Sequence, residues 1–134
     1  MRSNNATLNA QLARVISEMG HTDLIVVTDA GLPIPRDVER IDLALKADVP
    51  SFFDVLETVL AELEVEAATV AAEIAERSPE MFNQLTNLLE ERGVPVTLVP
   101  HAEFKERTAG ARAAVRSGEF TPYANVILQA GVVY

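Results

Sequence analysis

Residues 20–35 read Gly-His-Thr-Asp-Leu-Ile-Val-Val-Thr-Asp-Ala-Gly-Leu-Pro-Ile-Pro, and this stretch decides the fold class. Its centre, residues 24–27, is a continuous apolar run that predicts a strand buried on both faces. Pro33 and Pro35 then impose an extended loop. Strands covered on both faces are typical of α/β proteins, so the stretch indicates a layered α/β fold.

Helical and strand-like patterns alternate on both sides of this stretch. Before it, apolar residues share one face of a predicted helix that Gly20 is expected to end: Leu8, Leu12, Val15, Ile16 and Met19. After it, we expect strands at 41–45, 65–72, 94–99, 113–116 and 125–129, and helices at 51–63, 78–93 and 101–109. Segment 65–72 is ambiguous, because its alanines suit a helix while its alternation suits a strand, which we favour.

The alternation predicts a three-layer α/β sandwich formed by residues 1–134 as one domain. Its sheet is expected to be mixed and largely parallel, with about five or six strands flanked by helices and at least its central part parallel. A turn around Gly118 is expected to separate the last two strands.

Composition narrows the possible functions. The chain is 49% hydrophobic, and its net charge of −9 argues against nucleic acid and anionic membrane partners. It contains no cysteine, which excludes disulfides, thiolate nucleophiles and cysteine-based metal sites. Neither a secretory signal nor an apolar run of about 20 residues is visible, so we expect a cytoplasmic protein.

Two polar residues flank the apolar run at 24–27. His21 precedes it, and histidine is the side chain best suited to transfer protons near neutral pH, although a capping role is the simpler interpretation. Asp29 follows it, at the strand end where open α/β sheets bind ligands. Asp29 could form a local turn, accept hydrogen bonds from ligand hydroxyls, or orient His21.

Further candidates lie at two other strand boundaries. His101 follows the strand at 94–99 and opens a helix, while Tyr123 and Asn125 precede the last strand. A tyrosine hydroxyl and an asparagine amide together suit vicinal hydroxyls of a small polar molecule. Each residue alone would be interpreted as a surface or turn residue.

Several kinds of site have no sequence support. The two histidines lack metal-ligand spacing, and no glycine-rich nucleotide-binding loop occurs, so we expect neither a metal nor a cofactor. Ser51 and Ser117 lack the context of a nucleophilic serine. Alternating acidic residues most simply form a solvated face: Glu62, Glu64 and Glu66.

Five stretches together resemble the D-ribose pyranase family. They are Gly-His-Thr-Asp at 20–23, Val-Val-Thr-Asp-Ala-Gly-Leu-Pro-Ile-Pro at 26–35, Arg-Ile-Asp-Leu-Ala-Leu at 40–45, Val-Pro-Ser-Phe at 49–52, and Arg-Ser-Gly-Glu followed by Thr-Pro-Tyr-Ala-Asn-Val-Ile-Leu at 116–128. The resemblance covers nearly the whole chain. Related fucose mutarotases share the Gly-His and Asp-Ala elements, but Thr22-Asp23 and Gly31-Leu32-Pro33 favour the ribose branch.

The resemblance implies a cofactor-independent isomerase that interconverts β-pyranose and β-furanose forms of D-ribose. It implies that His21 is the catalytic acid/base and that the sugar is bound by five residues: Asp29, His101, Tyr123, Ala124 and Asn125. It also implies a cytoplasmic homodecamer with sites near subunit interfaces. Alternatives are a fucose-type mutarotase, a non-catalytic sugar-binding protein and a purely structural oligomer.

Overall fold

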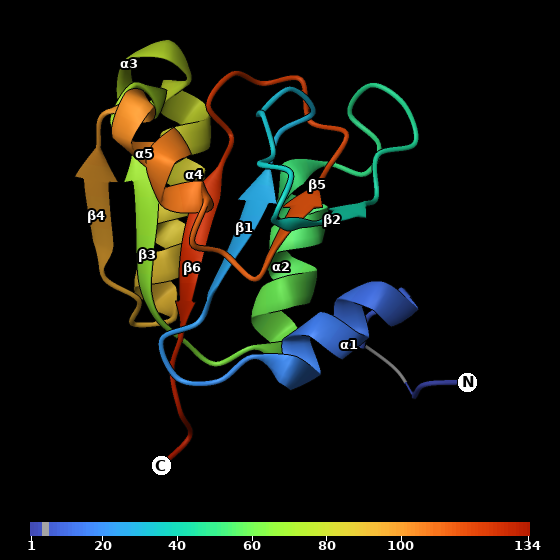
Figure 1. The fold of residues 1–134 in the computed structure, drawn as a ribbon. Coiled ribbons are helices and arrows are strands. Elements are labelled where there is room, and N and C mark those ends of the chain that lie inside the picture. Colours follow the sequence, from blue (N-terminus) through green and yellow to red (C-terminus); the bar gives the residue numbers. More distant parts are fainter. Residues whose placement is uncertain (4–5) are drawn as a thin grey trace.

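The computed structural model describes residues 1–3 and 6–134, in which five helices and six strands are formed (Figure 1). In chain order they are α1 (Ala10–Glu18), β1 (Leu24–Thr28), β2 (Glu39–Asp42), α2 (Phe52–Glu62), β3 (Val65–Ala71), α3 (Ile74–Arg77), α4 (Pro79–Glu91), β4 (Val96–Val99), α5 (His101–Thr108), β5 (Ala113–Arg116) and β6 (Val126–Ala130). Within the described ranges, no helix is both long and apolar enough to cross a membrane.

The strands form one sheet in the order β2-β5-β1-β6-β3-β4. β2, β5 and β1 are parallel, as are β3 and β4, so the predicted mixed and largely parallel sheet is confirmed. The expectation that the central part is parallel was wrong, because β6 is antiparallel to both β1 and β3. Loop 117–125 joins the carboxyl end of β5 to the amino end of β6 at the same edge of the sheet, so β6 runs back in the opposite direction.

Helices cover the two faces of the sheet unequally. α1, α2 and α4 pack on one face, where Leu12, Leu56 and Leu85 are fully buried against the strands. α5 lies on the opposite face, where Phe104 joins a smaller apolar cluster that includes Val26 of β1. The arrangement is the predicted three-layer sandwich.

Local signals set most element boundaries. Asn9 Oδ1 accepts the backbone N–H of Leu12 (2.8 Å), and Ser51 Oγ accepts that of Asp54 (3.1 Å), so both helices begin at side-chain caps. Pro79 occupies the first turn of α4, as predicted. Segment 65–72 forms strand β3, which confirms the favoured interpretation.

Other boundaries depend on tertiary contacts. β2 covers Glu39–Asp42, so it begins and ends earlier in the chain than the predicted strand 41–45, and the residues after it lead into a turn in which Lys46 pairs with Val49. β4 begins at Val96, after Pro95, whose ring nitrogen cannot donate to a strand partner. The sequence did not predict the short helix α3.

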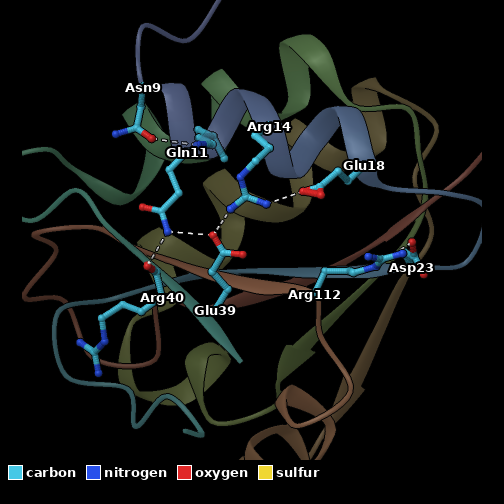
Figure 2. Close-up of polar contacts among 9 residues, drawn as sticks. Asn9, Gln11, Arg14, Glu18, Asp23, Glu39, Arg40 and Arg112 are labelled. Carbon is cyan, nitrogen blue, oxygen red and sulfur yellow. Dashed lines mark hydrogen bonds and ion pairs between the residues drawn. The ribbon is translucent and has the colours of Figure 1, made fainter. Parts of the chain in front are cut away.

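Side-chain contacts tie α1 to the edge strand β2 (Figure 2). Gln11 Nε2 donates to Glu39 Oε2 (2.9 Å) and to the carbonyl of Arg40 (3.0 Å), while Arg14 pairs with both Glu18 and Glu39. The Gln11 amide and then the Arg14 guanidinium hold the pKa of Glu39 below its ordinary value. Glu39 is therefore ionised when the protein is near neutral pH.

Gly118 is required where loop 117–125 crosses the loop after β2. A Cβ there would lie 2.5 Å from the carbonyl oxygen of Val49 and 2.6 Å from that of Lys46. Both oxygens are held by hydrogen bonds, since Val49 O accepts the N–H of Leu45 (2.9 Å) and Lys46 O accepts the N–H of Val49 (3.0 Å). The N–H of Gly118 also donates to the carbonyl of Pro50 (2.8 Å) and joins the two loops.

We expect Gly118→Ala to lower the free energy of unfolding by about 1–3 kcal/mol, because the loops must separate to admit the methyl group. Urea unfolding at fixed protein concentration measures the change. Gly31→Ala is the matched control, since nothing lies within 4 Å of a Cβ built at Gly31. Equal stability of the two variants would contradict the argument.

Candidate functional site

A cavity of about 590 Å³ opens where β1, β4 and β5 end. The polar side chains that line it come from the loop after β1, the end of α3, the start of α5, the end of β5 and loop 117–125: Asp29, Arg77, His101, Arg116, Glu119, Tyr123 and Asn125. Because β6 is antiparallel, its amino end lies at the same edge of the sheet as the carboxyl ends of the other strands. We call this the pocket edge.

Asp29 and Asn125 are joined by two reciprocal hydrogen bonds. The backbone N–H of Asp29 donates to Asn125 Oδ1 (2.8 Å), and Asn125 Nδ2 donates to Asp29 Oδ2 (3.2 Å). Asn125 is only 1% exposed, so its amide is oriented by these contacts rather than by water. The pair fixes one side of the cavity to the end of β1.

Asp29 also forms the local turn that the sequence suggested. Its Oδ1 accepts the backbone N–H groups of Gly31 (3.0 Å) and Leu32 (2.8 Å). A carboxylate has about four acceptor positions, so turn formation and contact with a ligand hydroxyl are compatible. The turn holds the carboxylate at the cavity wall.

His101 is fixed in place by both its backbone and its ring. Its backbone N–H donates to both carboxylate oxygens of Glu73 (3.0 Å each). Its ring lies nearly parallel to that of Phe104 (centroids 6.3 Å apart, 11°) and meets Tyr123 edge to face (5.0 Å, 88°). His101 Nδ1 is buried and has no hydrogen-bond partner among the described residues. The contacts with Phe104 and Tyr123 hold the ring of His101 at the cavity wall.

The Tyr123-Ala124-Asn125 stretch makes a tight turn into β6. Tyr123 has a left-handed φ of 64°, and its carbonyl accepts the N–H of Asn125 (2.8 Å). Ser78 Oγ donates to the carbonyl of Pro122 (2.9 Å), which ties the turn to the start of α4. Ala124 is fully buried, so its side chain belongs to the core and it can offer the cavity only backbone atoms.

Glu119 lines the cavity and was not among the sequence candidates. Its Oε1 accepts the backbone N–H of Phe52 (2.9 Å), and its Oε2 accepts the hydroxyl of Thr121 (2.7 Å). It is only 9% exposed and caps α2 from outside the helix. Its contact with Phe52 joins residues that are distant in sequence, so only its place in the Arg-Ser-Gly-Glu motif marked it.

His21 lies outside this cavity. It precedes β1 whereas Asp29 follows it, and five residues of strand separate them by about 17 Å. The suggestion that Asp29 orients His21 is therefore wrong within one chain. His21 Nε2 instead contacts Glu66 Oε2 at 2.9 Å. Glu66 is exposed, as the solvated-face interpretation expected, and it also has a side-chain partner.

The side chains gathered at the pocket edge indicate the class of protein. A carboxylate, an amide, a histidine with a free buried nitrogen and a tyrosine converge on a cavity within the volume range of small-molecule sites. Within residues 1–3 and 6–134, no group of three or more His, Cys, Asp or Glu side chains is arranged to hold a metal ion. The fold and site are those of an α/β protein that binds a small polar molecule.

Comparisons with known proteins identify the family. The profile of the RbsD / FucU transport protein family matches residues 2–133, and the chain belongs to this family. A D-ribose pyranase of Symbiobacterium thermophilum is 59% identical over 127 residues, covering 95% of each chain. A D-ribose pyranase of Laribacter hongkongensis is 55% identical over 130 residues, covering 97% of this chain and 98% of the relative.

Two solved structures extend the comparison. Bacillus subtilis RbsD complexed with D-ribose is 45% identical, with a TM-score of 0.94 over the whole of both chains. The fucose mutarotase of Streptococcus pneumoniae in complex with L-fucose is 26% identical, with a TM-score of 0.77, covering 98% of this chain and 96% of the other.

Asn125→Asp tests the pair that fixes the cavity wall. The substitution replaces the Nδ2 donor with a second carboxylate beside Asp29 in a buried position. We expect a loss of roughly 1–3 kcal/mol of unfolding free energy at pH 7. Part of this lost unfolding free energy should be recovered as the pH is lowered toward 5, because protonation of one of the two adjacent carboxylates restores an O–H donor.

Chemical unfolding at both pH values, relative to the unsubstituted protein, measures this difference. Asn87→Asp, on the exposed surface of α4, is the charge-matched control and should change stability little at either pH. A similar small effect at Asn125 would mean that the reciprocal pair contributes little.

Proposed function

We propose that this protein is a D-ribose pyranase, which interconverts the β-pyranose and β-furanose forms of D-ribose and so supplies the furanose for ribose use. The single observation that supports this most is that Asp29, His101, Tyr123 and Asn125, whose side chains offer donors and acceptors for hydroxyl groups, line one cavity. The relatives named D-ribose pyranase and the related structure with D-ribose add to it. In this proposal residues 1–134 form one sugar-mutarotase domain.

Ring interconversion needs proton transfers and no redox step. A base removes the proton of the anomeric hydroxyl, and an acid protonates the ring oxygen as the ring carbon–oxygen bond breaks. The open chain rotates, and a different hydroxyl then adds to the aldehyde carbon with the reverse transfers. Since the uncatalysed reaction proceeds in water, a positioned acid/base worth about 10²–10⁴-fold is sufficient.

We assign binding and proton transfer to different residues. Asp29, His101, Asn125 and the Tyr123 hydroxyl bind the sugar hydroxyls, with backbone atoms of Ala124 beside them, and hold the open chain for reclosure. His21 acts as the acid/base. Its imidazole is 53% exposed, so it is accessible to a sugar held by another molecule.

The site therefore needs two copies of the chain. His21 and the cavity of the same copy lie at opposite ends of β1, so the His21 that reacts must come from a neighbouring copy. A head-to-tail contact of this kind uses two different surfaces and generates a closed ring when the rotation between neighbours closes. Rings stacked in pairs are consistent with the predicted homodecamer.

Apolar residues at the rim of the cavity favour such a contact. Phe120 lines the cavity and is 66% exposed, and Leu45 and Val49 of the neighbouring loop are 78% and 39% exposed. Exposed apolar groups gathered beside a polar site are typical of interfaces.

Location in the cytoplasm stays a prediction from sequence.

His21→Ala tests the catalytic assignment. We expect the variant to keep its fold and ribose affinity but to lose most of the pyranose–furanose exchange, because it lacks the proton-transfer group. Saturation-transfer NMR of ribose with and without the protein measures the exchange. Wild-type exchange in the variant would remove His21 from the mechanism, and faster exchange with fucose than with ribose in the unsubstituted protein would favour the fucose-type alternative.

Mixing two inactive variants tests the shared site. His21→Ala keeps the cavity, and His101→Ala keeps the acid/base. If each site combines two copies, refolding the variants together in equal amounts should restore about a quarter of the wild-type exchange, since one interface in four then pairs two intact halves. A mixture as inactive as its components would show that each site lies within one chain.

A further inference from the structure

His21 belongs to a hydrogen-bonded chain of three side chains at the edge opposite the pocket. His21 Nε2 lies 2.9 Å from Glu66 Oε2, and Gln129 Nε2 donates to Glu66 Oε1 at 2.7 Å. Glu66 lies near the start of β3 and Gln129 near the end of β6, so the three residues come from separate parts of the sequence. Both oxygens of one carboxylate are thus engaged, one by a fixed amide.

Glu66 is an ionised acceptor in this arrangement. The Gln129 amide, and next the His21 imidazole, hold the pKa of Glu66 below its ordinary value. Other charged groups in the flanking segments are Glu64, two residues before Glu66, and Asp23, which lies two residues after His21 and pairs with Arg112 at 3.1 Å (Figure 2). The Gly20 backbone N–H and then Arg112 also lower the pKa of Asp23, so Asp23 is held by its own partners.

An ionised carboxylate has no hydrogen to donate. The 2.9 Å contact between Glu66 Oε2 and His21 Nε2 is therefore a hydrogen bond only when Nε2 carries the proton. In the neutral imidazole, the lone pair then lies on Nδ1. The geometry thus selects one tautomer and leaves Nδ1 as the nitrogen available to a sugar.

The backbone around His21 is also fixed. Thr22 has a left-handed φ of 71°, which is uncommon for a β-branched residue, and its N–H donates to the carbonyl of Ala130 (2.9 Å). The N–H of Ala130 donates to the carbonyl of Asp23 (2.8 Å). These bonds join the segment before β1 to the end of β6, beside Gln129.

Gly131 leaves room for the carboxylate. A Cβ at this position would lie 3.1 Å from Glu66 Cβ and 3.4 Å from Glu66 Oε2, the oxygen that contacts His21. Any larger residue would press on the acceptor. The Thr22 and Ala130 backbone hydrogen bonds, the Gln129 amide and the absence of a side chain at Gly131 therefore all help to fix the same two side chains. These are the side chains of His21 and Glu66.

We propose that Glu66, held by Gln129, is a positioning residue that keeps Nε2 of His21 protonated and presents Nδ1 to the sugar. This inference rests on the proposed role of His21 for its catalytic consequence, though the tautomer can be measured without catalysis. Nδ1 takes the proton of the anomeric hydroxyl and becomes N–H, and the imidazolium is stabilised by Glu66. Nδ1 then returns that proton to the ring oxygen as the ring opens, so the proton count balances.

Glu66→Gln tests the proposal. Two-bond ¹⁵N–¹H NMR spectra of the full-length protein report the tautomer of each histidine, and His21→Ala assigns the signals because the chain has only two histidines. We expect Nε2–H in the unsubstituted protein and a larger Nδ1–H fraction in Glu66→Gln. Saturation transfer with D-ribose should show exchange at saturation reduced at least about tenfold, with half-saturation changed less than about twofold.

Glu64→Gln is the matched control, because it removes the same charge from the same acidic run without touching His21. Its tautomer and exchange rate should equal those of the unsubstituted protein. Gly131→Ala provides a second route if Glu66→Gln does not fold, and it should shift the tautomer in the same direction by displacing Glu66 Oε2.

An unchanged His21 tautomer in both Glu66→Gln and Gly131→Ala would overturn the proposal. A changed tautomer with unchanged exchange would overturn its catalytic part. Wild-type exchange in His21→Ala would instead overturn the proposed function of His21 while leaving the tautomer result to stand, so the two failures are distinguishable.

Discussion

The antiparallel insertion of β6 between β1 and β3 is the constraint on which the rest of the structure depends. It brings the amino end of β6 to the edge where β1, β4 and β5 end, so Asn125 can exchange hydrogen bonds with Asp29. It brings the carboxyl end of the same strand to the opposite edge, so Gln129 can hold Glu66. One strand direction therefore organises both the ligand cavity and the surroundings of His21.

The two polar ends of the sheet have complementary chemistry. The pocket edge is concave and offers hydrogen-bonding groups, whereas the His21 edge presents an exposed imidazole backed by a carboxylate. Under the proposed assignment, the sugar-binding groups lie at one end of the sheet and the proton-transfer group lies at the other. That assignment requires two copies of the chain to form one site, which would link quaternary structure to the proposed activity.

Much of the fold could be predicted from local patterns. The apolar run at 24–27 forms the buried β1, Ser51 caps α2, and Pro79 opens α4, because each signal acts through neighbours in the chain. Asp29, His101, Tyr123 and Asn125 were candidates from their place at strand ends and expected sugar-binding residues from the family resemblance, and the cavity brings all four together. Glu119 and Glu66 were missed as functional neighbours, because Phe52 and His21, which they contact, are distant from them in sequence.

The sequence by itself determined the α/β class, the order of most elements and the residue types suited to a polar ligand, since periodicity, capping and loop composition are short-range properties. Only the tertiary structure decided that β6 runs antiparallel, that Glu66 rather than Asp29 contacts His21, and that His21 lies away from the cavity. Strand order and direction depend on which distant segments pair, and that choice is made by the packing of the whole sheet.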